Sequence, residues 1–254
     1  MIWLPVTHTL ASPLIKVPLL VAATARTAQA MTPPNPPLGP ENMKLYDGLG
    51  DSMKHAMVCS GYVHKGLYWA NVIAESAVII AEHFRSPRTF VPHPQVQASL
   101  PEAESKHATH NIRTRPWWSA GCALMYAGSA IRPASHHALG KLFTWELTVR
   151  NDHVLVTGGS YAVVRHPSFV GMAMLSVGLV LCHFSPGGYF AECVGWDTFA
   201  SKAFTVFWGG WILLIPTFLM TRVNTEDEVL RREFGKQWES YAERTPYKLI
   251  PYVY

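Results

Sequence analysis

The stretch from His153 to Gly171 reads HVLVTGGSYAVVRHPSFVG and decides the architecture of the chain. A short apolar run and a Thr-Gly-Gly-Ser cluster, which breaks regular structure, lead into Arg-His-Pro and then into a hydrophobic run that ends at Leu181. Charged groups resist burial in hydrocarbon, so we expect this Arg-His-Pro at a membrane–water boundary. Proline fits the first turn of a helix, and the free N–H groups of a helix start can hold a carboxylate. The motif alone is equally compatible with an arginine and a histidine that only anchor a helix at the interface.

The composition is that of an integral membrane protein. Of the 254 residues, 49% are hydrophobic and 15% are charged, against about 25% charged in typical soluble domains. The net charge of +4 is small, and no stretch mixes dense Lys and Arg with stacking aromatics, so we expect no nucleic acid as partner. The four cysteines show no metal-ligand spacing, and the adjacent His136 and His137 make a poor chelate. We therefore expect no metal site.

Five apolar segments predict an all-α protein with about five transmembrane helices. The expected spans are 1–30, 56–83, 117–131, 169–181 and 203–220. The first ends in Ala-Gln-Ala at 28–30, which resembles a signal-peptidase site, so cleavage is an alternative to a retained helix. Glu75 lies inside the second span, where it is either functional or paired with a neighbouring helix.

Along the chain we expect four regions: 1–30 as a span or signal peptide, 31–55 as a proline-rich linker, 56–116 as a second span with a polar loop, and 117–254 as a core. Glycines recur two turns apart in the third and fourth spans, which lets helices approach closely in lipid. Arg132 is expected to end the third span. A helix at the membrane interface is expected from His137 to Val149.

The tail after Arg222 predicts a separate amphipathic helix. Thr225 and Glu228 form the pattern of a capping box, with Thr225 as N-cap and the acids at the positive end of the helix. Apolar residues then recur at helical spacing until Pro246. Helix capping alone would therefore account for the acidic residues Glu226 and Asp227.

Together these elements resemble the isoprenylcysteine carboxyl methyltransferase family of membrane enzymes. The resemblance runs from about Gly121 to the C-terminus and depends on four motifs in order: GSAIRPASHHALG, HVLVTGGSYAVVRHPSFVG, RVNTEDEVLRREFGKQWESYA and IPYVY. The first half of the chain agrees only in being hydrophobic. The resemblance implies S-adenosylmethionine as methyl donor, held in a pocket roofed by the Arg-His-Pro segment and the C-terminal helix. It makes residues 117–254 a membrane methyltransferase core.

The resemblance also implies roles for single residues. Arg132 and Arg222 are implied near the substrate carboxylate. Cofactor contacts are implied at Glu146, His153, Val154, Leu155, Val156, Tyr161, His166, Pro167, Ser168, Phe169 and Glu226. The chain departs from the family pattern at three positions. Glu146 stands in place of glutamine, Phe169 in place of a common tyrosine, and Asp227 as the second acid of a usual Glu-Glu pair.

The implied reaction methylates the C-terminal carboxylate of a prenylated cysteine. An α-carboxyl has a pKa of about 3.5, so the nucleophile is ionised at neutral pH and no general base is required. A farnesyl or geranylgeranyl chain partitions into lipid by roughly 0.8 kcal/mol per CH₂, which explains a membrane enzyme. The implied location is the endoplasmic reticulum membrane, with several spans and the active site facing the cytosol.

Three other functions share part of this pattern. A phospholipid N-methyltransferase has similar motifs but would bind an amine headgroup, against which Arg132 and Arg222 argue. A membrane sterol reductase also ends in a tyrosine-rich segment like YKLIPYVY, but its longer tail signature is missing here. A scaffold or lipid-binding membrane protein would bind no cofactor.

Overall fold

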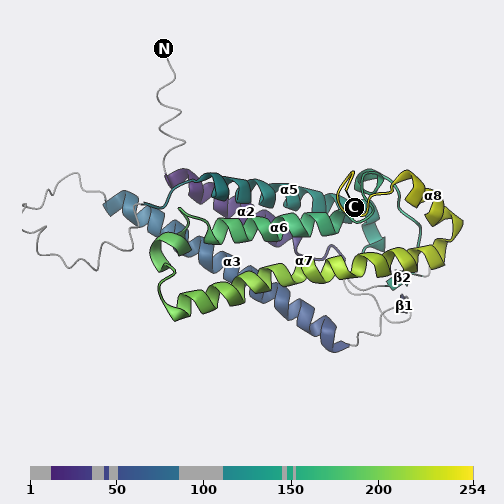
Figure 1. Cartoon of the computed structure of the whole chain (residues 1–254), viewed down its shortest axis with the longest axis horizontal. Coiled ribbons are helices and arrows are strands. Elements are labelled where there is room, and N and C mark those ends of the chain that lie inside the picture. The colour runs from purple at the N-terminus through teal and green to yellow at the C-terminus, as the bar shows by residue number, and fades with distance from the viewer. Residues whose placement is uncertain are drawn as a thin grey trace, which may run out of the picture.

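The computed structural model describes residues 13–35, 43–45, 51–85, 111–144, 148–150 and 153–253, with the backbone alone at 43–45, 51–60, 85 and 148–150. Within these ranges it is a bundle of long helices. The long helices are α2 (Lys16–Ala30), α3 (Asp51–Arg85), α5 (Pro116–Leu139), α6 (Pro167–Phe184) and α7 (Phe199–Phe234), followed by the shorter α8 (Lys236–Arg244). Figure 1 shows α5 beside α6, and α7 extending past α6 to α8, near the C-terminus.

Short elements connect the long helices. They are the 3₁₀ helices η1 (Pro13–Ile15), η5 (Gly140–Leu142) and η6 (Gly159–Ala162), the π-helix η7 (Phe190–Val194), and the strands β1 (Met43–Leu45) and β2 (Thr148–Arg150). The two strands pair antiparallel, with Met43 opposite Arg150. The all-α expectation is therefore confirmed except for this short ladder.

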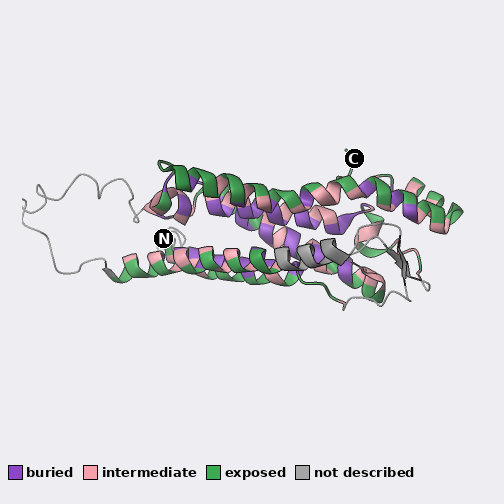
Figure 2. Cartoon of the chain, turned by 90° about the horizontal axis from the view of Figure 1, so that it is seen from below, coloured by how far each residue is buried: buried purple, intermediate pink, exposed green. Residues whose placement is uncertain are grey.

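The described part of every expected span is helical. Two helices, α6 with 18 residues and α7 with 36, are long and apolar enough to cross a membrane, each with a mean hydropathy of 1.7 in its best window. The count of five spans stays a prediction. Buried residues line the surfaces where helices face each other (Figure 2), whereas α7 exposes Phe199, Val206 and Phe207.

The expected boundary at Arg132 is wrong, and so is the interface helix from His137 to Val149. Helix α5 continues through Pro133 to Leu139, and η5 and β2 follow. The proline removes one hydrogen bond. Buried residues continue past it, including Ser135 and His136, because α5 packs on α6 over this turn as well. Tertiary packing therefore outweighs the local helix stop.

The capping box at Thr225 is also wrong. Helix α7 runs without a break to Phe234, and Val223, Asp227 and Val229 are buried in this part of it. This packing keeps the polar stretch helical. The break comes at Gly235, whose φ of 49° lies in the left-handed region that favours glycine, and α8 begins directly after it. The amphipathic tail helix is thus shorter than expected.

The glycines of α5 and α6 bring the two backbones together, as their spacing predicted. A Cβ atom on Gly128 would lie 2.5 Å from the carbonyl oxygen of Gly171, and one on Gly121 would lie 2.7 Å from that of Gly178. Any side chain at these positions would push the helices apart. This close packing fixes the start of α6 relative to α5.

A buried ion pair holds α2 in the bundle. Lys16 and Glu75 pair with each other and are both 0% exposed. The Lys16 ammonium also donates to the carbonyl of Gly187 at 2.8 Å and lies 4.8 Å from the ring centre of Trp118. Of the two interpretations of Glu75, pairing with a neighbouring helix is the one observed.

We predict that Gly128→Ala lowers the free energy of unfolding by about 1–3 kcal/mol, the usual cost of overpacking a tight contact. The control is Gly210→Ala in α7, where an added Cβ meets nothing within 4 Å. Thermal unfolding of both variants in one detergent measures the difference. Equal midpoints for the two variants would contradict the close α5–α6 contact.

Candidate active site

The end of the chain folds back onto the Arg-His-Pro corner. The backbone N–H of Arg165 donates to the carbonyl of Tyr247, and that of His166 donates to the carbonyl of Lys248, both at 2.9 Å. The ammonium of Lys248 donates to the side chain of Asn224 on α7 at 2.6 Å. The last residues therefore tie the start of α6 to the second half of α7.

Helix α8 is fixed over the segment that precedes this corner. The hydroxyl of Tyr241 donates to the carbonyl of Tyr161 at 2.8 Å. The guanidinium of Arg165 lies 5.6 Å from the ring centre of Trp238, close enough for a cation–π contact. Burial, with a smaller contribution from Asp227, raises the pKa of Tyr241 to about 12, so this phenol keeps the proton that it donates.

A cluster of charges joins the corner to α7. The Nε2 atom of His166 lies 3.0 Å from Asp227 Oδ1, and its Nδ1 atom lies 3.4 Å from Glu226 Oε2. Arg165 contacts the other oxygen of Asp227 at 3.1 Å, and Arg222 contacts the other oxygen of Glu226 at 3.1 Å. Each carboxylate thus bridges His166 and one arginine. The side chains of His166 and Asp227 are only 5% and 10% exposed.

These contacts set the protonation of His166. Burial acts to lower its pKa, but hydrogen bonds to Asp227 and Glu226 and their negative charges outweigh burial, and the pKa is raised above its ordinary value. A protonated imidazole donates from both ring nitrogens, one to each carboxylate. Tyr161 lies nearby, and burial together with the charge of Glu226 raises its pKa.

Arg132 lies apart from this cluster, inside the bundle and 4% exposed. Its Nε donates to the carbonyl of Ala30 at 2.8 Å, and a terminal nitrogen donates to the hydroxyl of Ser168 at 2.9 Å. The same hydroxyl lies 3.4 Å from Nε2 of His136. Arg132 and Ser168 therefore join α2, α5 and the first turn of α6.

The other expected cofactor residues are spread around the corner. Pro167 begins α6, as predicted, and the ring of Phe169 stacks on His166 with centroids 5.4 Å apart. His153 contacts Phe234, with ring centroids 5.8 Å apart. Val154 is 65% exposed, Val156 is half-buried, and Leu155 lines a pocket described next. Glu146 lies outside the described residues.

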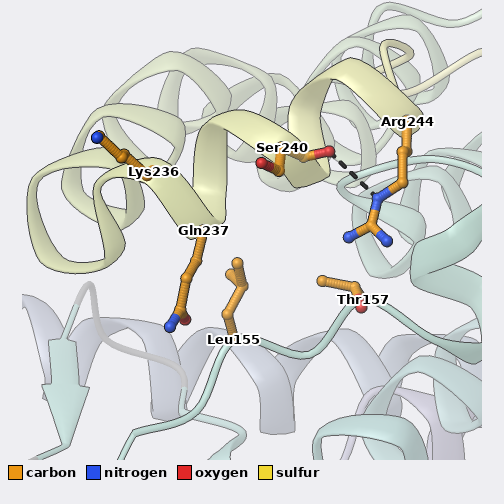
Figure 3. Close-up of a pocket in the computed structure, with 6 residues that line it drawn as sticks. All are labelled: Leu155, Thr157, Lys236, Gln237, Ser240 and Arg244. Carbon is orange, nitrogen blue, oxygen red and sulfur yellow. Dashed lines mark hydrogen bonds between the residues drawn. The ribbon is translucent and has the colours of Figure 1, made fainter.

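A pocket of about 460 Å³ lies between residues 153–157 and α8. Leu155 and Thr157 form one side, and the other side consists of Lys236, Gln237, Ser240 and Arg244. Figure 3 shows Gln237 and Arg244 extending from α8 toward the segment of Leu155 and Thr157. Arg244 Nε also donates to the carbonyl of Ser240 at 3.2 Å.

Of the ten described residues that the resemblance implies as cofactor contacts, Leu155 alone lines this pocket. The size and polar lining of the pocket nevertheless suit S-adenosylmethionine. Its volume lies in the range of small-ligand sites, about 300–1,000 Å³. Arg244 and Lys236 supply positive charge for a carboxylate, and Ser240, Thr157 and Gln237 supply hydrogen bonds for sugar hydroxyls or a base. Among the described residues, no group of three His, Cys, Asp or Glu side chains could hold a metal ion.

Sequence reasoning missed the α8 side of this pocket and the role of Arg165. Lys236, Ser240 and Arg244 are four residues apart and share one helix face, which was a usable signal. The misplaced helix start at Thr225 hid it. Tyr241 belongs to the apolar positions that recur at helical spacing in the tail, and local sequence does not indicate that its hydroxyl donates to the carbonyl of Tyr161.

We predict that Asp227→Asn lowers the free energy of unfolding by about 3 kcal/mol, because it removes the buried countercharge of Arg165 and one of the two carboxylates that contact His166. Glu228→Gln is the control, since Glu228 pairs with Arg232 on the exposed surface and should matter by less than about 1 kcal/mol.

The stability from His166 should also depend on pH. Its folded pKa is raised, so the contribution is complete below the unfolded pKa of about 6.5 and is lost as pH rises through the folded value. From pH about 6 to about 9, the unfolding midpoint should fall more in the wild type than in the Asp227→Asn variant. Equal losses would contradict the His166–Asp227 contact.

Comparison with known proteins gives matches that cover part of this region. The profile of the isoprenylcysteine carboxyl methyltransferase family matches residues 121–196. Protein-S-isoprenylcysteine O-methyltransferase B of Arabidopsis thaliana is 30% identical over 143 residues, 54% of this chain and 61% of the relative. Protein-S-isoprenylcysteine O-methyltransferase of Dictyostelium discoideum is 28% identical over 133 residues, 52% of this chain and 48% of the relative.

A second class of enzyme also matches. The Delta(14)-sterol reductase TM7SF2 of Mus musculus is 28% identical over 104 residues, which is 39% of this chain but 20% of that protein. The chain thus spans about half the length of the methyltransferases that it matches, and a smaller part of the reductase. Over residues 121–196, the comparisons confirm the resemblance to the isoprenylcysteine carboxyl methyltransferase family.

Proposed function

We propose that this chain is an S-adenosylmethionine-dependent protein-S-isoprenylcysteine O-methyltransferase. The observation that carries the proposal is the charge cluster of His166, Glu226 and Asp227, which holds the tail against the Arg-His-Pro corner beside the α8 pocket. The family match over residues 121–196 and the names of the two relatives support it. The core that performs the reaction is residues 117–254.

The cofactor would lie in the pocket under α8. When bound, S-adenosylmethionine supplies a methyl group on a positively charged sulfur. Arg244 would bind its carboxylate, Ser240 and Thr157 would bind its hydroxyls, and Leu155 would contact its apolar parts. Glu146, outside the described residues, is proposed as a further cofactor contact.

The acceptor would be the C-terminal carboxylate of a prenylated cysteine. It is already ionised at neutral pH, so the protein needs to orient it rather than to remove a proton. Arg222 suits this role, because its planar guanidinium can bind both carboxylate oxygens. Its contact with Glu226 fixes the direction of the side chain. Arg132 donates hydrogen bonds to Ala30 and Ser168 and would support the site indirectly, by fixing the start of α6. Its proximity to the substrate carboxylate stays a prediction.

The protein would be a multi-pass protein of the endoplasmic reticulum membrane with the pocket facing the cytosol. Four Lys or Arg residues lie in 132–165 and six in the tail from Arg222, whereas the connection between the expected spans 169–181 and 203–220 has Lys202 as its one Lys or Arg residue. The segment 85–116 carries five, although a count of five spans would put it on the lumenal side. By the positive-inside rule, the two basic regions share the cytosolic side, where the cofactor is made. The prenyl chain would enter from the lipid.

The test is an assay of purified protein in detergent with methyl-labelled S-adenosylmethionine and one acceptor at a time. We expect label in N-acetyl-farnesylcysteine and none in phosphatidylethanolamine or without acceptor. Label in phosphatidylethanolamine alone would mean a phospholipid N-methyltransferase. No transfer, with reduction of a sterol double bond by a nicotinamide cofactor, would mean a sterol reductase. If the protein performs neither reaction and binds no cofactor, the scaffold or lipid-binding function would be the one that remains.

Three arginine variants divide the proposed roles in the same assay. Arg244→Ala should weaken cofactor binding by about 10-fold, the value of one charge-assisted contact. Arg222→Ala should reduce turnover at saturating cofactor with little change in cofactor affinity. Arg231→Ala is the control, because Arg231 pairs with Glu239 on the surface with its side chain 62% exposed. If Arg222→Ala lost cofactor affinity but kept normal turnover, the role of Arg222 would be overturned.

A further inference from the structure

A second group of buried polar side chains lies inside the bundle. His64 and Tyr68 come from α3, His183 from the last turn of α6 and Trp208 from α7. All four are nearly inaccessible, with His183 the most exposed at 5%. The ring centroids lie 4.7 Å apart for His64 and Tyr68, 5.9 Å for Tyr68 and His183, and 5.2 Å for His64 and Trp208. Three helices therefore meet at this cluster through ring contacts.

The cluster is far from the pocket under α8. His183 follows His166 by 17 positions along the chain, which is roughly 25 Å at the rise of an α-helix. The proposed methyl transfer uses none of the four residues. Their polar atoms therefore need a separate explanation.

Four polar atoms in the cluster are unsatisfied. Among the described residues, neither ring nitrogen of His64, nor the hydroxyl of Tyr68, nor Nε2 of His183 has a hydrogen-bond partner. Native proteins leave few buried polar groups unpaired, because a dry unpaired group is destabilising. Four such atoms on neighbouring rings indicate a shared partner rather than four separate defects.

The hydrogen bonds that are present define what the partner must offer. His183 Nδ1 lies 3.0 Å from the carbonyl of Leu179, which only accepts, so Nδ1 carries the proton. A charged imidazole is costly in this interior, so Nε2 of His183 has a free lone pair. Neutral His64 adds one N–H and one lone pair, and Tyr68 adds an O–H. The site thus presents two imidazole lone pairs and two donors.

We propose that His64, Tyr68 and His183 form a binding site for a neutral hydroxyl group, with Trp208 as an apolar wall. A hydroxyl both donates and accepts, so one or two of them satisfy lone pairs and donors together. A metal cation would take the two lone pairs and leave the donors of His64 and Tyr68 unpaired. The hydroxyl comes either from ordered water or from the alcohol of a membrane lipid. By bridging the rings of His64, Tyr68 and His183, it links α3 to α6.

The test begins with Tyr68→Phe, which removes one hydroxyl and keeps the ring. If the Tyr68 hydroxyl bonds to an occupant, the variant loses that bond, and its unfolding midpoint falls by about 3 °C. If the hydroxyl is dry and unpaired, its removal leaves the midpoint unchanged or raises it, and the proposal is overturned. Tyr62→Phe is the matched control on the same helix, because the Tyr62 residue is 71% exposed.

A second measurement separates the two sources and excludes a metal. With water as the occupant, the fall in Tyr68→Phe persists in protein stripped of lipid. With a lipid alcohol, 1-dodecanol raises the midpoint of stripped wild type, its methyl ether does not, and Tyr68→Phe does not respond. Elemental analysis that finds one transition metal per purified chain, lost in Tyr68→Phe, would overturn the hydroxyl site.

Discussion

The contact between His166 and Asp227 is the interaction on which the candidate site depends. It lies between the first residue before α6 and the buried side of α7, and it acts only because α7 continues as one helix past Thr225. From there the turn at Gly235 directs α8 back over residues 153–157. Without the carboxylates of Glu226 and Asp227, the basic corner formed by Arg165, His166 and Arg222 would repel itself rather than hold the tail. Charge pairing and the backbone hydrogen bonds from Arg165 and His166 together close this end of the molecule.

The rest of the bundle serves to hold the corner in place. Close glycine contacts set α5 against α6, and Arg132 fixes the first turn of α6 through Ser168. At the opposite end, the buried pair of Lys16 and Glu75 ties α2 to α3. Two rules for apolar surroundings explain these contacts. Small residues allow close helix contact, and a buried charge persists only with its partner. The same rules make the unsatisfied rings of His64, Tyr68 and His183 informative.

Periodicity and composition were sufficient to predict the helical segments, the start of α6 at Pro167 and the glycine contact, because each depends on near neighbours in the chain. They also allowed Glu75 to be read as a paired charge. Predictions from periodicity and composition failed where tertiary packing decides whether a helix continues. The four residues from Thr225 form a valid local cap, but the burial of Val223, Asp227 and Val229 keeps the helix intact. The α8 face of the pocket was lost with that error. Hydrogen bonds such as that from Tyr241 to Tyr161, which join residues 80 positions apart, cannot be predicted from local sequence.

The central claim is that the docked tail and residues 153–157 form the two walls of one cofactor pocket. Ultraviolet cross-linking of labelled S-adenosylmethionine to the purified protein, followed by peptide mapping, tests it most directly. The account predicts label within 153–157 and within α8, removed by excess unlabelled S-adenosylhomocysteine and reduced in the Asp227→Asn variant. Specific label confined to other parts of the chain, or no label that competes, would contradict it.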